Sequence, residues 1–132
     1  MFTKTVKKIL RLGLAIATIS ASPTLAAPIS PQEIVTLTSD TSHVSVNGEN
    51  LVYFAPDGSL KITNIETEEV IIGKWHITTT SKVCVVIKKE SCYKATQTKA
   101  ALCYASKSKK FCRSKEAYMR GDQTSVYLKK QT

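Results

Sequence analysis

The cysteines are the residues of this chain with the clearest chemical potential, and all four lie in its second half, at Cys84, Cys92, Cys103 and Cys112. Four thiolates can hold a zinc ion, but zinc ligands usually arrive as pairs two to four residues apart, and these spacings are wider. In an oxidising compartment, an even number of thiols instead forms disulfides. We therefore predict two structural disulfides, with no metal site and no cofactor.

The pairing of these cysteines depends on which strands they occupy. If segments 83–87 and 91–95 form a hairpin that turns around Lys88, the first two cysteines lie opposite one another at bridging distance. The same reasoning pairs the last two across residues 106–109. We expect this local pairing. The nested arrangement, which joins the first cysteine to the last and the second to the third, stays open at this point, as does the remaining arrangement.

Basic side chains crowd around the last two cysteines, with Tyr104, Phe111 and Tyr118 among or beside them. Ammonium and guanidinium groups bind phosphate or sulfate, and aromatic rings offer surface for stacking or packing. A disulfide would clamp this segment into a loop with partly preorganised charges. The alternative is that these charges keep a small domain soluble and offset an acidic first half. The candidate binding residues are Lys107, Lys109, Lys110, Arg113 and Lys115.

Catalytic residues find little support in the sequence. His43 and His76 alternate with apolar residues, so we expect both to face solvent, and they lack metal-binding spacing. No nucleophile, zinc-protease or phosphate-loop motif is present. Glu66, Glu68 and Glu69 could suggest a cation site, but carboxylates on a surface loop are more often solvated. We therefore predict that the chain is not an enzyme and has no catalytic residue.

The first 26 residues have the three parts of a secretory signal peptide. Four basic residues open it, the stretch 12–19 is almost wholly apolar, and small residues stand at 24–26. A membrane anchor is the alternative, but a spanning helix needs about 20 apolar residues, and polar residues interrupt this run. We predict a periplasmic or secreted protein with a single β domain over 27–132 and no transmembrane helix in its mature form.

Charge is unevenly distributed along the chain. The leader carries four of the 19 basic residues and none of the 10 acidic ones, so its removal lowers the net charge from +9 to +5. Residues 28–73 contain one lysine and seven carboxylates, whereas residues 74–132 contain fourteen basic residues and three carboxylates. This asymmetry indicates either a charged ligand or two halves that attract each other in the fold.

Most of the mature chain alternates apolar and polar residues between short turns, which is typical of strands. One helical signal precedes the strands: Ser30, Pro31 and Glu33 form a capping-box pattern that opens a short helix through Leu37. After it, three runs between Val83 and Ala105 alternate with lysine-bearing turns.

Two turns organise the first strands. Asn47 and Gly48 tolerate the positive φ angles of a tight hairpin, and the pattern predicts such a hairpin there. Asp57 can bond to the backbone beside it, and Gly58 supplies a left-handed exit ahead of a strand over 60–65. These turns predict consecutive antiparallel strands.

The longest predicted strand extends over 70–79 and places Trp75 in the core. Gly73, two places earlier on the same face, is expected to leave room for the indole ring or for a bulge. Near the end of the chain, Val126 and Leu128 predict a closing strand. Segment 106–121 is the least regular part and is expected to be a loop or an inserted hairpin.

These elements predict an all-β fold: a small antiparallel barrel or sandwich of about seven or eight strands with a short N-terminal helix. No helix of crossover length lies between the strands, which argues against a parallel sheet. A domain of about 105 residues buries only about two-thirds of its unfolded surface, so we expect a small free energy of unfolding. Each disulfide would add roughly 2.5 kcal/mol by restricting the unfolded chain.

Four short motifs resemble a known family. They are Tyr-Phe-Ala-Pro-Asp-Gly at 53–58, Gly-Lys-Trp at 73–75, Val-Cys at 83–84 and Cys-Tyr at 92–93. The pattern resembles small exported bacterial proteins of the type called domain of unknown function 995. The resemblance covers about half of the mature chain, and it implies a compact lipocalin-like or barrel-like fold with no established activity. The last two cysteines and the basic segment around them are additional to that pattern.

Four functions compete on this basis. An exported, non-catalytic binding or inhibitor-like module leads, with the basic segment holding an anionic ligand or an acidic partner. The alternatives are a structural envelope protein, a small hydrolase, and a lipocalin-like carrier of an apolar ligand in the barrel interior. We expect an anionic envelope component or an acidic protein as the partner, and no cytoplasmic nucleic acid. The sequence leaves the oligomeric state open.

Overall fold

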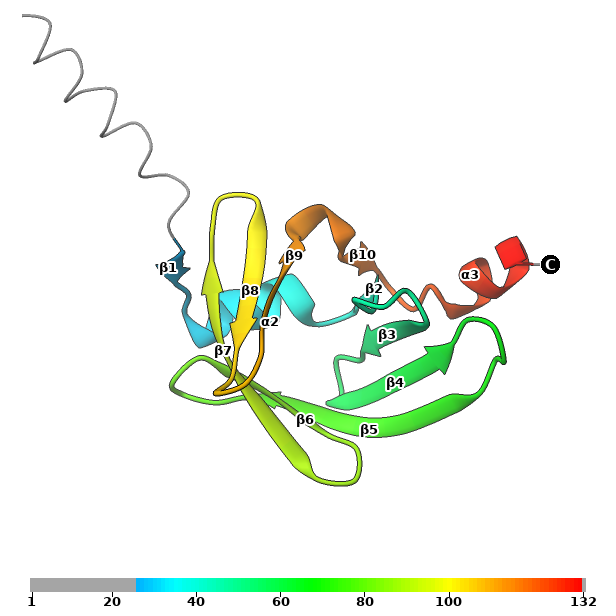
Figure 1. Ribbon diagram of the computed structural model, residues 1–132, viewed down its shortest axis with the longest axis horizontal. Helices are drawn as coiled ribbons and strands as arrows, with labels where there is room; N and C mark the ends of the chain where they lie inside the picture. The colour runs from blue at the N-terminus through cyan, green and yellow to red at the C-terminus, as the bar shows by residue number, and fades with distance from the viewer. Residues whose placement is uncertain (1–25, 132) are drawn as a thin grey trace, which may run out of the picture.

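The computed structural model describes residues 26–131 and gives them an all-β architecture with short helices at its margins (Figure 1). The predicted signal peptide, residues 1–26, lies outside the described residues except for Ala26 and stays a prediction. None of the helices among the described residues has the length and apolar character that crossing a membrane requires.

Within the described residues, ten antiparallel strands form one sheet that curls into a half-barrel. Its order is β10-β2-β3-β4-β5-β6-β7-β8-β9, and β1 pairs separately with β7. The predicted all-β class is confirmed; about seven or eight strands were predicted, and eight of the ten observed are four residues or longer. The strands are β1 (Ala27–Pro28), β2 (Thr41–Val44), β3 (Asn50–Phe54), β4 (Ser59–Asn64), β5 (Val70–Ile77), β6 (Lys82–Val86), β7 (Glu90–Gln97), β8 (Ala101–Ala105), β9 (Lys110–Ser114) and β10 (Met119–Arg120).

The two longest strands produce the curl, because each changes partners halfway along. β5 pairs with β4 over residues 70–74 and with β6 over 74–77. β7 pairs with β6 over 90–94 and with β8 over 94–97, where β1 takes the place that β6 has left. Strands that exchange partners in this way coil the sheet. They also leave one half of an edge free on each of the two strands.

The register assigns every side chain to the concave or the convex face, because directly opposed residues in antiparallel strands share a face. Along β3 to β5, the concave face carries Phe54, Leu60 and Trp75, which are buried together. The indole N–H of Trp75 donates to the carbonyl of Ala55 at 2.9 Å, and the ring meets Phe54 edge to face. The predicted core position of Trp75 is confirmed.

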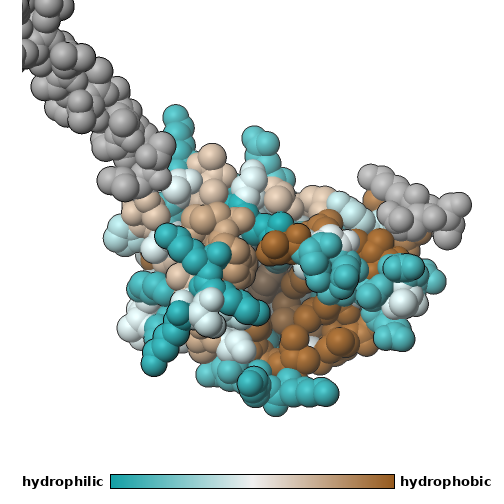
Figure 2. Space-filling model, viewed as in Figure 1, coloured by the Kyte–Doolittle hydropathy of each residue, from teal (hydrophilic) through white to brown (hydrophobic). Residues whose placement is uncertain are grey.

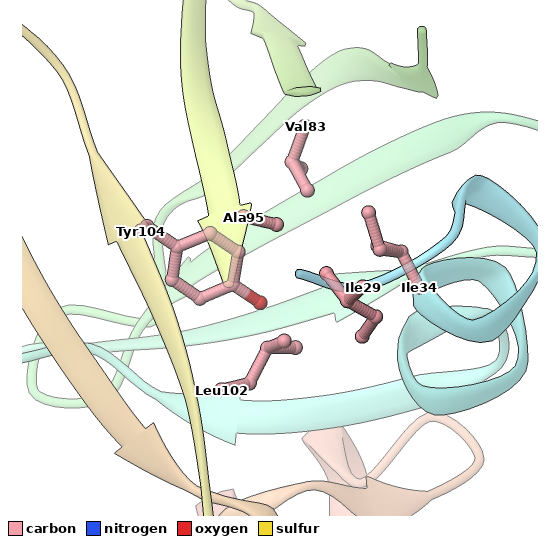
Figure 3. Close-up of a cluster of buried hydrophobic side chains, with 6 residues drawn as sticks. All are labelled: Ile29, Ile34, Val83, Ala95, Leu102 and Tyr104. Atoms are coloured by element: carbon pink, nitrogen blue, oxygen red, sulfur yellow. The ribbon is translucent and has the colours of Figure 1, made fainter. Parts of the chain in front are cut away.

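The first helix, α2 (Pro31–Thr38), covers the other half of the concave face. Its predicted capping box is present: the Ser30 hydroxyl accepts a hydrogen bond from the Glu33 N–H at 3.1 Å, and Glu33 reaches back to the Ser30 N–H. Gln97 on β7 donates to the Glu33 carboxylate at 3.2 Å, and this bond, followed by those from Ser30, lowers the pKa of Glu33. The buried cluster is drawn in Figure 3 and comprises Ile29, Ile34, Val83, Ala95, Leu102 and Tyr104.

Three expectations about local elements need correction. The predicted closing strand at Val126 and Leu128 is helical, within α3 (Thr124–Gln131). The hairpin at Asn47 is looser than a two-residue turn, because Ser45 N–H bonds to the Asn50 carbonyl around a longer loop, and only Gly48 has positive φ. The irregular segment after residue 106 contains β9, the short helix η2 (Lys115–Ala117) and β10.

His43 also departs from its expected position, whereas His76 is exposed as predicted. The concave face includes His43, whose ring stacks on Phe54 at 5.6 Å and meets Tyr118 edge to face at 4.9 Å. Its Nδ1 is buried without a hydrogen-bond partner. Burial, with a smaller contribution from the Arg113 charge, lowers the pKa of His43 to about 4. The imidazole is therefore a neutral core side chain at neutral pH.

Gly73 is required by a backbone approach and not by the indole ring. A β-carbon built at this position would lie 2.4 Å from the carbonyl oxygen of Val86, where the β6–β7 hairpin leaves β5. Backbone atoms cannot move aside as a flexible side chain can. The glycine therefore permits the change of partners along β5.

We predict that Gly73→Ala lowers the free energy of unfolding by roughly 1–3 kcal/mol, because the added methyl group overpacks a site walled by backbone. Urea unfolding measures this change. Val46→Ala is the control, since Val46 is 71% exposed and its truncation should cost less than about 0.5 kcal/mol. Equal effects of the two substitutions would contradict the close approach.

We predict that the stability of the protein falls as the pH drops from 6.5 towards 4, because the unfolded chain protonates His43 at its ordinary pKa of 6.5 and the folded chain only near 4. Between about pH 7.5 and about pH 4.5, the titration of His43 alone should lower the free energy of unfolding by roughly 2.5 kcal/mol. His43→Phe keeps an aromatic ring and should lose that much less stability over the same interval in urea unfolding. His76→Gln, the exposed counterpart, should lose as much stability as the wild type. If His43→Phe also loses as much as the wild type, His43 is not the cause of the pH dependence.

Candidate anion-binding groove

Two cross-strand disulfides hold the β6–β9 half of the sheet. Cys84 on β6 bonds to Cys92 on β7, and Cys103 on β8 bonds to Cys112 on β9. The Cα atoms are 4.1 Å and 4.0 Å apart, as expected for directly opposed residues of non-hydrogen-bonded pairs. The local pairing predicted from the sequence is confirmed, and both disulfides lie on the convex face. Disulfides of this kind persist in an oxidising, non-cytoplasmic compartment.

Each disulfide lies just behind a hairpin tip. Between β6 and β7 the tip is formed by residues 87–89, and between β8 and β9 by residues 106–109. The second tip is closed by two bonds, from Ser106 N–H to the Lys109 carbonyl at 2.8 Å and from Lys109 N–H to the Ser106 hydroxyl at 3.2 Å. The disulfides therefore restrict how far the two strands behind each tip can separate.

The two tips lie at the same end of the sheet and border an open groove of about 400 Å³. The groove follows the part of β7 that β8 does not cover, because β8 pairs with β7 only from Lys94 onward. Ammonium groups, hydroxyl groups and one disulfide sulfur surround it. Its lining residues are Lys89, Ser91, Cys92, Tyr93, Ser106, Ser108 and Lys109.

A backbone donor adds to these side chains. Ala95 N–H bonds to the Ser81 carbonyl on the β6 side of β7 at 3.0 Å. Backbone groups alternate in direction along a strand, so the N–H of Cys92 points away from β6, towards the groove. An anion in the groove can thus meet lysine ammonium groups, serine hydroxyls and a backbone N–H. This is the donor set that phosphate and sulfate oxygens accept.

The predicted binding residues do not all come together. Lys107, Lys109 and Lys110 are exposed at or beside the second tip. Arg113 instead points to the concave face, where its Nη2 is buried without a partner. Lys115 lies at the far end of β9 and donates to the Gln97 side chain at 3.0 Å. Three of the five predicted residues therefore lie at or beside the second tip, and one of them, Lys109, lines the groove.

The sequence reasoning missed Lys88 and Lys89, which lie at the first tip. The signal was available in the predicted pairing: two consecutive hairpins, β6–β7 and β8–β9, turn at the same end of an antiparallel sheet. Five exposed lysines thus gather at this end, namely Lys88, Lys89, Lys107, Lys109 and Lys110. Glu90 is the only carboxylate between residues 82 and 115, a stretch with ten basic residues.

The convex face next to the groove is also basic. Lys82 and Lys94 are directly opposed in the β6–β7 pair, and Lys110 occupies the same cross-strand row beyond Ala105. Like charges that face each other across strands are unfavourable. Lys94 turns its ammonium group to the carbonyl of Thr80 at 2.5 Å.

Three titratable side chains of the concave face, His43, Tyr104 and Tyr118, are in forms of low reactivity at neutral pH. The hydroxyls of Tyr104 and Tyr118 are hydrogen-bonded at 2.6 Å. Burial raises the pKa of both phenols, that of Tyr118 to about 12, so both stay protonated. His43, with a pKa near 4, is a weak base. We therefore place the candidate site at the hairpin tips and not in the interior.

One group of potential metal ligands lies on the convex face. In the part of the chain that the structure describes, His76, Cys84 and Glu90 bring one ligand atom each within 4.8 Å of one another. The sulfur of Cys84 is bonded to Cys92, so it is not a thiolate. His76 and Glu90 alone, 3.7 Å apart, form an exposed pair.

Comparison with known proteins leaves the site to be judged on its geometry. No family model, no curated protein and no solved structure matches the chain. The resemblance to the domain of unknown function 995 type stays a prediction. The charge, the donors and the clamped tips described above are therefore the basis for function.

We predict that the double variant Cys103→Ser/Cys112→Ser loses about 2.5 kcal/mol of stability, since the bridge closes a loop of sequence separation 9. Amide hydrogen exchange should accelerate over residues 104–111, where the tip loses its clamp, and stay unchanged over β3 and β4. Exchange rates and urea unfolding that match the wild type would show that the staple does not order the tip.

Proposed function

We propose that the chain is an exported, non-catalytic binding module that holds an anionic partner in the groove between its two lysine-bearing hairpin tips. The observation that carries this proposal is that two separate tips carry five exposed lysines at one end of the sheet, and that one lysine from each tip, Lys89 and Lys109, lines the groove between them. Lysines that served only solubility would not require a disulfide a few residues behind each tip. The periplasm or the extracellular space is the compartment we propose for it.

The chemistry of the groove favours a partner that presents phosphate or sulfate groups. Lysine ammonium groups act as point charges towards such oxygens, and hydroxyl and backbone donors add direction. The groove is open and lies at one end of the molecule, so it suits groups along a polymer or an envelope surface better than an enclosed small molecule. An anionic envelope polymer is the partner class we propose.

Preorganisation supports the same conclusion. A flexible loop must be ordered when it binds, and that ordering reduces affinity. The tips are short, and a disulfide fixes the strands of each hairpin close to its turn. The conformational entropy that the tips lose on binding is therefore smaller.

The proposal predicts that Lys89→Gln/Lys109→Gln weakens binding of a fluorescently labelled inorganic polyphosphate about tenfold or more at about 150 mM salt, since two charge-assisted contacts are lost. The control is Lys82→Gln/Lys99→Gln, which removes the same charge from exposed lysines at the opposite ends of the same strands. Fluorescence anisotropy measures both dissociation constants.

Two further outcomes bear on this test. Wild-type affinity should fall steeply between about 50 mM and about 500 mM salt, because the contacts are electrostatic. Equal losses in the two double variants would mean that net charge alone attracts the probe, and the groove proposal would then be wrong. Melting curves of both variants should superimpose on that of the wild type, which excludes unfolding as the cause.

A further inference from the structure

An apolar hollow adjoins the basic groove on the concave face of the sheet. Val85 is directly opposite both Trp75 and Ser91, so all three side chains lie on that face. The hollow has a volume of about 240 Å³ and is lined by Val85, Ile87, Lys88, Lys89 and Ser91. Because Lys89 and Ser91 also line the groove between the two hairpin tips, the hollow and the groove meet at these two residues.

Apolar side chains continue from this hollow across β5 and β4. Ile87 lies over β5, because a β-carbon built at Gly73 would be 3.4 Å from the Ile87 Cγ1 atom. Ile71 is two places before Gly73 on the same face of β5 and is directly opposite Ile62 on β4. We call this the apolar surface, and it comprises Val52, Ile62, Ile71, Val85 and Ile87.

The apolar surface is accessible although it lies on the concave face. Ile71 is 50% exposed and Ile87 is 45% exposed, whereas Val52, Ile62 and Val85 are partly buried against the cluster that contains Trp75. Figure 2 shows hydrophobic surface gathered where β4 and β5 run, bordered by hydrophilic residues where the β6–β7 tip lies. Apolar surface with a polar rim is typical of ligand-binding grooves and interaction sites.

We propose that the anionic partner is acylated: its phosphate group binds in the basic groove, and its hydrocarbon chain lies on the apolar surface. This inference rests on the proposed function and adds the chemistry of the partner's other end. Lys89 serves both ends, because a lysine can direct its ammonium group to an anion while its methylene stem covers apolar surface. Cationic groups beside an apolar surface are complementary to an anionic amphiphile such as a phosphorylated lipid.

The shape of the hollow favours a hydrocarbon chain over a segment of another protein. An α-helix with its side chains is about 10–12 Å across, which is too wide for a hollow of about 240 Å³. An extended peptide would place backbone N–H and C=O groups against the aliphatic side chains of Val85 and Ile87, where they would lack partners. A hydrocarbon chain has no such groups and fits both the width and the chemistry of the hollow.

Dodecyl phosphate, used below its micelle-forming concentration, tests the inference. Inorganic phosphate is the control probe without a chain, and dodecyl maltoside is the control probe without a charge. Dodecyl phosphate should bind about tenfold or more tightly than either control, because buried methylene groups and the charged head both contribute. Isothermal titration calorimetry at about 150 mM salt measures the three dissociation constants.

Two neighbouring isoleucines of β5 provide a matched pair of variants. Ile71→Ser removes apolar area from the concave face, whereas Ile72→Ser makes the same change on the convex face, where Ile72 is opposite Lys61. Both isoleucines are at least half exposed, so both variants should fold. Ile71→Ser should weaken binding of dodecyl phosphate about threefold or more, and Ile72→Ser should leave it unchanged. Ile87→Ser should act as Ile71→Ser does, and none of the three should change the affinity for polyphosphate.

The failure of this inference is distinguishable from the failure of the proposed function. If polyphosphate binding depends on Lys89 and Lys109 but dodecyl phosphate binds no more tightly than inorganic phosphate, the groove proposal holds and the acylated partner is wrong. Equal effects of Ile71→Ser and Ile72→Ser on dodecyl phosphate would also overturn it, because the chain would then prefer neither face. Dodecyl maltoside that binds as tightly as dodecyl phosphate would show that the apolar surface acts without the groove, and would overturn the proposed link between them.

Discussion

The cross-strand disulfides fix the geometry on which the other features depend. Each joins two directly opposed residues on the convex face, so the register of β6 with β7 and of β8 with β9 cannot slip. A one-residue slip would exchange the two faces of a strand. In this half of the sheet it would turn Val83, Ala95 and Tyr104 away from Ile34 and empty the core under α2. The same staples hold the lysine-bearing tips in place.

The second constraint is the exchange of partners along β5 and β7. A sheet whose strands all paired along their full length would leave neither the groove beside β7 nor the open edge of β5. Gly73 makes the exchange in β5 sterically feasible, because the Val86 carbonyl occupies the place of a side chain. The coil of the sheet thus creates both the basic groove beside β7 and the open apolar edge of β5.

Local features were predictable from the sequence, and features that depend on the curl were not. The capping box at Ser30 and the pairing of the cysteines require only neighbouring residues, and both are confirmed. His43 was misplaced because alternation tells two faces apart but does not say which face the curl encloses. Arg113 was misplaced for the same reason: it follows Cys112, and only the curl shows that this cysteine lies on the convex face and directs the next side chain inward. The pattern at Val126 and Leu128 fits a helix as well as a strand, and the segment is too short for its length to distinguish the two.

The most direct test of this account is a tryptic peptide map of the exported protein under non-reducing conditions. Trypsin cleaves after lysine and arginine, and such residues separate every pair of neighbouring cysteines. The structure predicts two linked products: peptide 83–88 joined to peptide 90–94, and peptide 100–107 joined to peptide 111–113. A link between one of the first two cysteines and one of the last two, or four free thiols, would contradict the stapled register and with it the placement of the groove.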